Sequence, residues 1–300
     1  MHVGRLELQP AINMLKVATL QQYLEFANKS AKIGGRSNMS SPLLQDWERA
    51  EVERSAAEAS HANVADLLAD ERQVRRYLDP PADTCYPLEY SYHLLGDVRG
   101  KTVLEYGCGD GLNTLVLARR GARVKALDIS PDLINVARQR LSANGITGDV
   151  EFIVGSAHDL PLPDDSVDVV FGMAILHHLD LALSAREVKR VLRKGGRAIF
   201  NEPVRNSKLM TALRNLIPYK APDISPFERP LTDKELINYA HGFASYRSRP
   251  FTLPTTNLIN VLPPLQRRFI HTFNRWDAAI LQKLPMLAYY ATGRVVELVK

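Results

Sequence analysis

The sequence predicts an α/β fold whose doubly wound sheet is mostly parallel, ends in an antiparallel strand and carries helical cap segments. Three observations lead to this prediction. Short apolar runs alternate with helix-like segments between residues 101 and 203, a glycine-rich turn follows the first run, and two more strand-like segments lie towards the C-terminus. Strands and helices that alternate at this spacing form parallel β-α-β units with helices on both faces of the sheet.

The alternating region gives the expected elements in order. The expected strands are the apolar runs at residues 102–107, 123–130, 151–157, 167–176 and 197–203. Helices are expected over residues 112–121, 131–145 and about 182–192, and Pro131 suits the first turn of the second one. Residues 245–253 and 293–300 are predicted to form the antiparallel edge of the sheet, with a largely helical region at about 258–287 between them.

The first 80 residues are expected to form a helical cap. Apolar residues recur at helical spacing over residues 10–32, and the turn-rich stretch at residues 34–38 suggests a hinge. A second helical region is predicted over residues 43–78, rich in Ala, Glu and Arg, and two prolines end it. Residues 81–300 are then expected to form the main domain, with a helical insertion over the substrate at about 204–288.

Composition narrows the class of protein. The chain has 300 residues, of which 45% are hydrophobic and 24% are charged, as in ordinary globular proteins. Its two cysteines provide neither a disulfide framework nor metal-ligand spacing, so no metal site is expected. The N-terminus lacks the pattern of a secretory signal, and no apolar run is long enough to span a membrane. These features favour a cytoplasmic monomer or homodimer.

The central observation is a glycine-rich loop after the first expected strand. Residues 103–111 read Val-Leu-Glu-Tyr-Gly-Cys-Gly-Asp-Gly, and the glycines let the backbone turn tightly and approach a ligand closely. The next expected strand ends in Asp128, seventeen residues after Gly111. A carboxylate there can accept hydrogen bonds from both hydroxyls of a ribose, because ligands of such sheets bind at the carboxyl ends of the strands.

A dinucleotide site is the main alternative, since a glycine-rich turn by itself fits both kinds of nucleotide. The spacing here is Gly-x-Gly-x-Gly, and Leu112 stands where a dinucleotide fingerprint has its third glycine. Glu105 would repel a diphosphate but attract an ammonium group. The loop therefore favours S-adenosylmethionine, which carries an ammonium and no phosphate, over NAD.

The order of these motifs resembles that of the class I S-adenosylmethionine-dependent methyltransferases, whose fold is Rossmann-like. Residues 105–111 are similar to the first motif of the family, and Asp128 is similar to its ribose-binding acid. Residues 155–161, 166–170 and 193–197 resemble the adenine-binding segment, the fourth strand and the turn before the fifth strand. The similarity covers about residues 80–204. One departure is Ser156, where the family often has an acid.

The resemblance implies a role for each matching residue. Glu105 would reach the ammonium group of the cofactor, Asp128 would hold its ribose, and Ile129 would pack on its adenine. The residues expected near its methionine moiety are Gly107, Cys108, Gly109 and Gly111. Those expected at its adenine edge are Ser156, Ala157 and His158, and those expected near its sulfonium are Gly172 and Met173.

A candidate catalytic group follows the fourth expected strand. Methyl transfer to a hydroxyl needs an aligned acceptor and a base that removes its proton. His177 and His178 lie on the carboxyl side of the sheet, and Glu202 ends the fifth strand. Sugar and natural-product O-methyltransferases, which the sequence resembles, often carry such a histidine pair and acid. One histidine is predicted to take the proton while Glu202 orients it or binds substrate; alternatively, the pair only caps the next helix.

The expected activity is methyl transfer to a hydroxyl of a small, partly apolar metabolite or natural product. The alternatives are methylation of nucleic acid or protein, an NAD-linked oxidoreductase, and an inactive cofactor-binding scaffold. Residues 201–300 hold fourteen Lys and Arg against seven Asp and Glu, which also suits a solvated face. No zinc knuckle or aromatic-basic signature accompanies them, so no nucleic-acid partner is expected.

The insertion itself allows three interpretations. Apolar residues recur every three or four positions from Leu258 to Leu284 and predict a helix. This helix either packs on the core or a partner subunit, roofs an apolar acceptor, or uses its basic side chains to dock on an anionic membrane.

Overall fold

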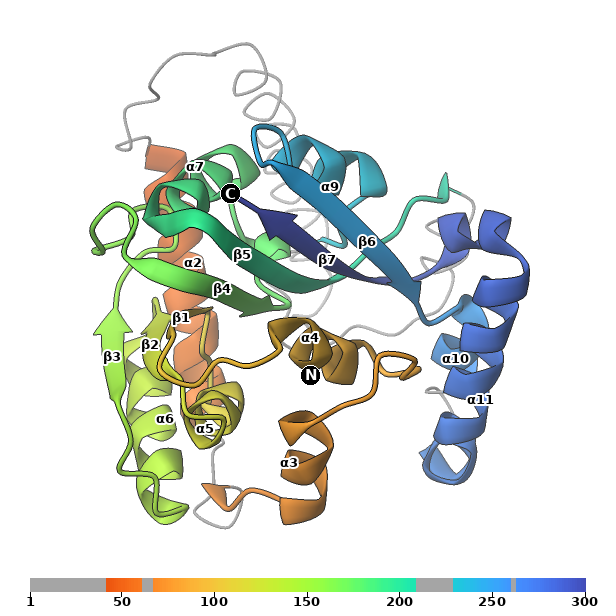
Figure 1. The fold of residues 1–300 in the computed structure, drawn as a ribbon, viewed down its shortest axis with the longest axis horizontal. Coiled ribbons are helices and arrows are strands. Elements are labelled where there is room, and N and C mark those ends of the chain that lie inside the picture. The colour runs from red at the N-terminus through yellow and green to blue at the C-terminus, as the bar shows by residue number, and fades with distance from the viewer. Residues whose placement is uncertain (1–41, 61–66, 209–228, 260–262) are drawn as a thin grey trace, which may run out of the picture.

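The computed structural model describes residues 42–60, 67–208, 229–259 and 263–300 (Figure 1). Within these residues a seven-stranded sheet lies at the centre, and helices pack on both of its faces (Figure 1). The expected helix over residues 10–32 and the expected hinge at residues 34–38 lie outside the described residues.

The sheet confirms the predicted fold class. Its strand order is β3-β2-β1-β4-β5-β7-β6. The first five strands pair in parallel, whereas β7 pairs antiparallel with β5 and with β6. The strands are β1 (Thr102–Tyr106), β2 (Arg123–Asp128), β3 (Val150–Val154), β4 (Val167–Met173), β5 (Leu192–Pro203), β6 (Ser245–Phe251) and β7 (Gly293–Val299). Strand β5 begins earlier than expected, because Leu192 already pairs with Val167 before a register shift.

The three helices that connect the parallel strands were expected from the sequence. They are α5 (Leu112–Arg119), α6 (Pro131–Ala143) and α7 (Leu181–Val191). Side chains cap two of them: Ser130 accepts a hydrogen bond from the Leu133 N–H at the start of α6, and Asp180 accepts from the N–H groups of Ala182 and Leu183 at the start of α7. Capping at these points fixes the turns that follow β2 and β4.

The outer helices differ more from the prediction. The helical region expected over 43–78 is two helices, α2 (Pro42–Ser60) and α3 (Glu71–Leu78), and Asp70 caps the second. Helix α4 (Pro87–Leu95) was not expected. Near the C-terminus lie α9 (Asp233–Tyr239), α10 (Pro254–Ile259) and α11 (Pro263–Lys283), with short 3-10 turns η2 (Leu176–His178) and η3 (Pro285–Tyr290). Among the described residues, none of the helices has both the length and the apolar character needed to cross a membrane.

Two apolar cores lie on the two faces of the sheet. One packs α3, α4, α5 and α6 against the sheet, and Tyr92 and Phe171 are fully buried in it. The other packs α7 and α9 against the opposite face around Tyr106 and Phe200. Burial on both faces keeps the carboxyl ends of β1, β2 and β4 in fixed relative positions.

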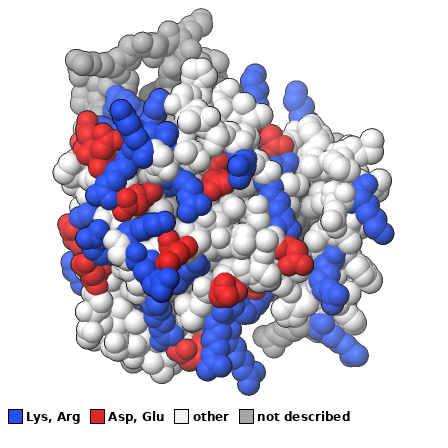
Figure 2. All heavy atoms as spheres, viewed as in Figure 1, with Lys and Arg blue, Asp and Glu red and all other residues white. Residues whose placement is uncertain are grey.

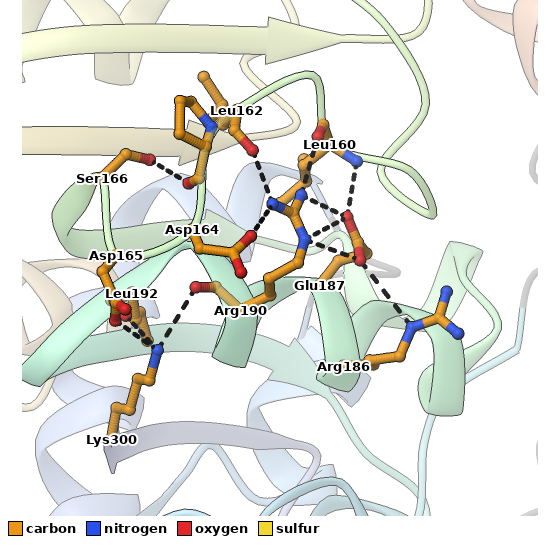
Figure 3. A network of polar contacts seen from close by, with 11 residues as sticks. Leu160, Leu162, Asp164, Asp165, Ser166, Arg186, Glu187, Arg190, Leu192 and Lys300 are labelled. Carbon is orange, nitrogen blue, oxygen red and sulfur yellow. Dashed lines mark hydrogen bonds and ion pairs between the residues drawn. The ribbon is translucent and has the colours of Figure 1, made fainter. Parts of the chain in front are cut away.

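A polar network holds the segment that follows β3 (Figure 3). Arg190 of α7 donates to the carbonyl oxygens of Leu160 at 2.9 Å and Leu162 at 2.7 Å. Glu187 accepts from the Leu160 N–H at 3.0 Å and pairs with Arg190 at 2.7 Å. Lys300, which follows β7, donates to the Leu192 carbonyl at 2.6 Å and so attaches the end of β7 to the start of β5. Arg190 and Glu187 thus hold the residues just after Ala157 and His158 in place.

Candidate cofactor and active site

The three glycines of the loop after β1 differ in what surrounds them. Gly107, Gly109 and Gly111 all have positive φ, between 52° and 82°. A Cβ on Gly111 would lie 2.6 Å from the Cβ of Ala137, and one on Gly107 would lie 2.8 Å from Cδ1 of Ile175. A Cβ on Gly109 would meet nothing within 4 Å. Gly107 and Gly111 therefore serve packing, whereas the open space beside Gly109 admits the close approach of a ligand.

Asp128 is held rigidly at the end of β2. Its Oδ2 accepts a hydrogen bond from the Gly109 N–H at 2.9 Å, and its Oδ1 accepts one from the Ser130 N–H at 2.9 Å. Burial raises the pKa of the carboxyl, and these two backbone N–H groups oppose that rise. The acid and the glycine loop are thus joined by a direct hydrogen bond.

Both features border one cavity of about 230 Å³. Eight of the residues expected at the cofactor or as catalysts line it: Gly107, Gly109, Asp128, Ile129, Ala157, His158, Met173 and His178. They come from the segments after β1, β2, β3 and β4, which meet at the carboxyl edge of the sheet. The structure therefore brings together at one cavity residues that lie up to 71 positions apart in the chain, from Gly107 to His178.

The wall opposite the sheet is helix α2, which belongs to the cap expected over residues 1–80, although none of its contacts was predicted. Glu48 pairs with Nδ1 of His158 at 2.9 Å and accepts a hydrogen bond from the Ser156 hydroxyl at 2.5 Å. One turn later, Glu51 lies 3.4 Å from Nδ1 of His178. Helix α2 also lines the cavity through Trp47, Arg54, Ser55 and Glu58. No periodicity within residues 42–60 reveals these partners, because they lie more than 100 residues further along the chain.

The cavity wall carries an excess of negative charge. Glu48, Glu51, Glu58 and Asp128 line it together with one guanidinium, that of Arg54. Burial alone would raise the pKa of Glu51, but His178 and Arg54 beside it lower that pKa to about 2, so this carboxyl stays charged. A cavity of this charge suits a cation and disfavours a diphosphate.

Glu105 lies under the glycine loop and not in the cavity wall. It is 2% exposed and accepts a hydrogen bond from the Thr114 hydroxyl at 2.5 Å. Its other oxygen, Oε1, is buried without a hydrogen-bond partner. Burial raises the pKa of this carboxyl to about 8. Its unsatisfied oxygen leaves one hydrogen-bond acceptor open, so the contact with an ammonium group that the sequence assigned to Glu105 stays a prediction.

Four other expected cofactor residues do not line the cavity. Cys108 is buried, and burial raises the pKa of its thiol, so it packs as a neutral side chain. Gly172 is needed for packing, since a Cβ there would lie 2.7 Å from Cδ1 of Phe200. Ser156 bonds to Glu48, and Gly111 begins α5 in a left-handed conformation. Their predicted contacts with the cofactor stay predictions.

The two histidines after β4 have different surroundings. Nδ1 of His177 lies 2.8 Å from Oε2 of Glu202, and both side chains are buried. The other oxygen of Glu202 accepts hydrogen bonds from the N–H groups of Ile175 and Leu176. His178 stacks on His177, with ring centroids 4.1 Å apart, and lines the cavity. Only His178 of the pair therefore faces the place where a ligand can bind.

A second cavity, of about 850 Å³, lies at the end of β6. It is lined by residues 81–86, by Phe251 and by the inner side of α11, including Asn274 and Leu281. None of its lining residues borders the first cavity. The glycine loop and Asp128 are therefore associated with the smaller cavity alone.

Comparison with known families agrees with this site. Residues 104–200 match a family model described as a methyltransferase domain. They form a class I S-adenosylmethionine-dependent methyltransferase domain. The matched range runs from β1 to β5 and includes the glycine loop, Asp128 and the histidine pair. S-Adenosylmethionine is the cofactor of this family, and the recognition made from the sequence is confirmed.

Individual relatives of this methyltransferase domain are known by sequence. The chain is 40% identical over 120 residues to a fatty-acid O-methyltransferase of Mycolicibacterium smegmatis, a match that covers 38% of this chain and 42% of that protein. It is 39% identical over 131 residues to a magnesium-protoporphyrin O-methyltransferase of Rhodobacter capsulatus, covering 43% of this chain and 55% of that protein. The matches thus span about half the length of these relatives.

The fold of the methyltransferase domain also occurs in solved structures. The geranyl diphosphate C-methyltransferase of Streptomyces coelicolor A3(2) superimposes with a TM-score of 0.53 at 16% sequence identity, covering 86% of this chain and 97% of that one. At this identity the likeness concerns the fold.

Proposed function

We propose that the protein transfers the methyl group of S-adenosylmethionine to a hydroxyl of a small, partly apolar molecule. The observation that carries this proposal is the acid-lined cavity in which the open side of Gly109 and the carboxylate of Asp128 meet. Similarity to a fatty-acid O-methyltransferase and to a magnesium-protoporphyrin O-methyltransferase supports transfer to oxygen on acceptors with apolar parts.

Different residues at the cavity and below the glycine loop would hold different parts of the cofactor. Asp128 would accept hydrogen bonds from the ribose hydroxyls, Ile129 and Ala157 would pack beside the adenine, and the unpartnered Oε1 of Glu105 below the loop would accept a hydrogen bond from the ammonium group. Gly107, Gly109 and Met173 border the methionine end. When bound, S-adenosylmethionine supplies an electrophilic methyl group on a sulfonium.

His178 is the proposed base, since it is the histidine of the pair that lines the cavity. Glu51 beside its Nδ1 favours a proton on that nitrogen and leaves Nε2 to accept the proton of the acceptor hydroxyl. His177 and Glu202 are positioning residues: Glu202 holds the backbone of the segment after β4, and His177 supports the ring of His178.

We also propose how the chain divides into a cap and a methyltransferase domain. Residues 81–300 form the methyltransferase domain, with a helical insertion at about 204–288, and residues 1–80 form a cap. The contacts of α2 with His158 and Ser156 support a cap that closes the cofactor cavity from outside the sheet.

Calorimetry tests the cofactor assignment first. S-Adenosylmethionine and S-adenosylhomocysteine are expected to bind, and NAD is expected to give no heat of binding. Binding of NAD with no binding of the two sulfur compounds would overturn the assignment.

Two matched variants then test the base. With a panel of apolar hydroxylated acceptors, His178→Asn is expected to lower the rate of S-adenosylhomocysteine production by about a hundredfold, the usual contribution of a general base. Its affinity for S-adenosylhomocysteine should change little. His177→Asn should instead lower the midpoint of thermal unfolding, because it leaves Glu202 buried without this partner. Unchanged turnover in the His178 variant would remove it from the mechanism.

A further inference from the structure

Helix α11 and turn η3 carry an apolar stripe that no described part of the protein covers. Along α11 and the residue that follows it, positions 269, 273, 276, 280 and 284 are spaced by three or four, so they lie on one side. Trp276 is 58% exposed and Met286 is 78% exposed. The exposed apolar residues of this stripe are Phe269, Trp276, Ile280, Leu284, Met286, Tyr289 and Tyr290. A roof over an acceptor would bury such residues, so this face of α11 is not a roof.

The charges beside the stripe are all positive. Residues 254–290 contain four Arg and Lys and a single carboxylate, Asp277. Lys283 follows Ile280 by one turn and is exposed, and the guanidinium of Arg268 lies 5.5 Å from the centre of the Phe269 ring. In Figure 2 basic side chains stand in an otherwise uncharged surface on the right of the view, where Figure 1 shows α11.

The one carboxylate of this region is turned inward. Asp277 is 2% exposed and accepts hydrogen bonds from the Leu253 N–H at 2.7 Å and from the hydroxyls of Thr255 and Thr256 at 2.8 and 2.6 Å. These bonds attach α11 to the chain just after β6. They also remove the single negative charge of α11 from its outer surface, so the stripe meets solvent beside basic groups only.

We propose that this outer face of α11 and η3 docks on an anionic lipid surface. An amphipathic helix with basic side chains beside an apolar face lies in the plane of a membrane interface, and Trp and Tyr side chains favour that level. A second copy of the chain fits the face less well, because pairing two such stripes brings Arg268 and Lys283 of both copies close together. The proposal is independent of the methyl acceptor.

Vesicle sedimentation tests this proposal with the full chain. The protein is expected to sediment with vesicles of phosphatidylcholine and phosphatidylglycerol, to sediment far less with phosphatidylcholine alone, and to be released by salt. The double variant Arg268→Glu/Lys283→Glu should lower partitioning onto the anionic vesicles by about tenfold or more, since each basic residue near such a surface contributes about 1 kcal/mol. Trp276→Ala should lower it several-fold.

Matched controls lie on other surfaces. Arg72→Glu/Lys101→Glu reverses two exposed basic residues elsewhere, and Ile237→Ala removes an exposed apolar side chain of α9 that is 57% exposed. These controls should sediment like the unaltered protein, and all variants should keep their affinity for S-adenosylhomocysteine. Equal loss in the controls, or no binding to anionic vesicles, would overturn the proposal. A dimer in sedimentation velocity that Trp276→Ala converts to a monomer, without vesicle binding, would assign the face to a second copy.

Discussion

Helices α2 and α11 are similar in length and both lie outside the sheet, but their charged residues point in opposite directions. Helix α2 has 19 residues and turns Glu48 and Glu51 towards His158 and His178 in the cofactor cavity. Helix α11 has 21 residues, buries its one acid, and presents basic and apolar side chains to solvent. The two helices thus differ in where their acids point: Glu48, Glu51 and Glu58 of α2 line the cofactor cavity, whereas Asp277 of α11 is bonded to residues 253–256.

The largest expected effect separates the two helices by ligand affinity. Glu51→Lys places a cation in the cavity wall beside Arg54, so it should weaken binding of S-adenosylmethionine by about a hundredfold, equal to about 3 kcal/mol. The opposite reversal on the other helix, Lys283→Glu, should leave that affinity unchanged. Calorimetry measures both, and equal affinities in the two variants would break the comparison.

Substitutions in α2 and α11 should also differ in their effect on the free energy of unfolding. Glu48→Ala removes the partner of two side chains, Ser156 and His158, and should lower the free energy of unfolding by about 1–3 kcal/mol. Arg268→Ala, whose side chain lies at the surface of α11, should change it by less than about 0.5 kcal/mol. Urea titration of the two variants provides the measurement. A larger loss in the Arg268 variant would show that α11 depends on its outer charges.

The pH dependence of stability tests the protonation of Glu105, which lies beneath the glycine loop. The pKa of Glu105 is raised from 4.5 to about 8, so the folded protein holds a proton that the unfolded chain releases. This contribution is complete below pH 4.5 and is lost as pH rises towards 8, with a slope of up to about 1.4 kcal/mol per pH unit. The ligand-free protein should therefore lose stability between pH 5 and 8. Glu105→Gln should flatten this loss, and an identical slope in the variant would contradict it.

The last prediction compares two glycines on the sheet side of the same cavity, whose expected losses differ by about 1 kcal/mol. Gly111→Ala should destabilise the protein by about 2 kcal/mol or more, because its Cβ would overlap Ala137. Gly109→Ala meets open space, so it should cost about 1 kcal/mol of backbone strain and mainly lower cofactor affinity. Thermal unfolding of the two variants measures the loss of packing, and calorimetry with the cofactor measures the loss of ligand contact.

The sheet and one side of the site could be predicted because their signals are local. Each parallel strand contains a short apolar run, and Gly109, Asp128 and His178 lie at or just after the ends of such runs, so their position at the carboxyl edge could be predicted. Fold class depends on this order, and the order is readable from spacing alone.

The rest of the site depends on distant contacts, which spacing does not encode. The sequence could not show that Glu48 and Glu51 face the cavity, nor that His177 turns to Glu202 while its neighbour lines the cavity. Nor could spacing show that a Cβ on Gly172 would lie 2.7 Å from Cδ1 of Phe200 on the next strand. Helix α4 was missed because its nine residues form less than three turns and have no strong apolar period.

The contacts of α2 also set an order of events during folding. Glu48 is made before His158, which lies 110 positions later, and Glu51 is made before His178. While the chain leaves the ribosome, Glu48 and Glu51 lack these two histidine partners until residues 158 and 178 have emerged. The acid-lined wall of the pocket is therefore completed only after synthesis has passed the middle of the chain.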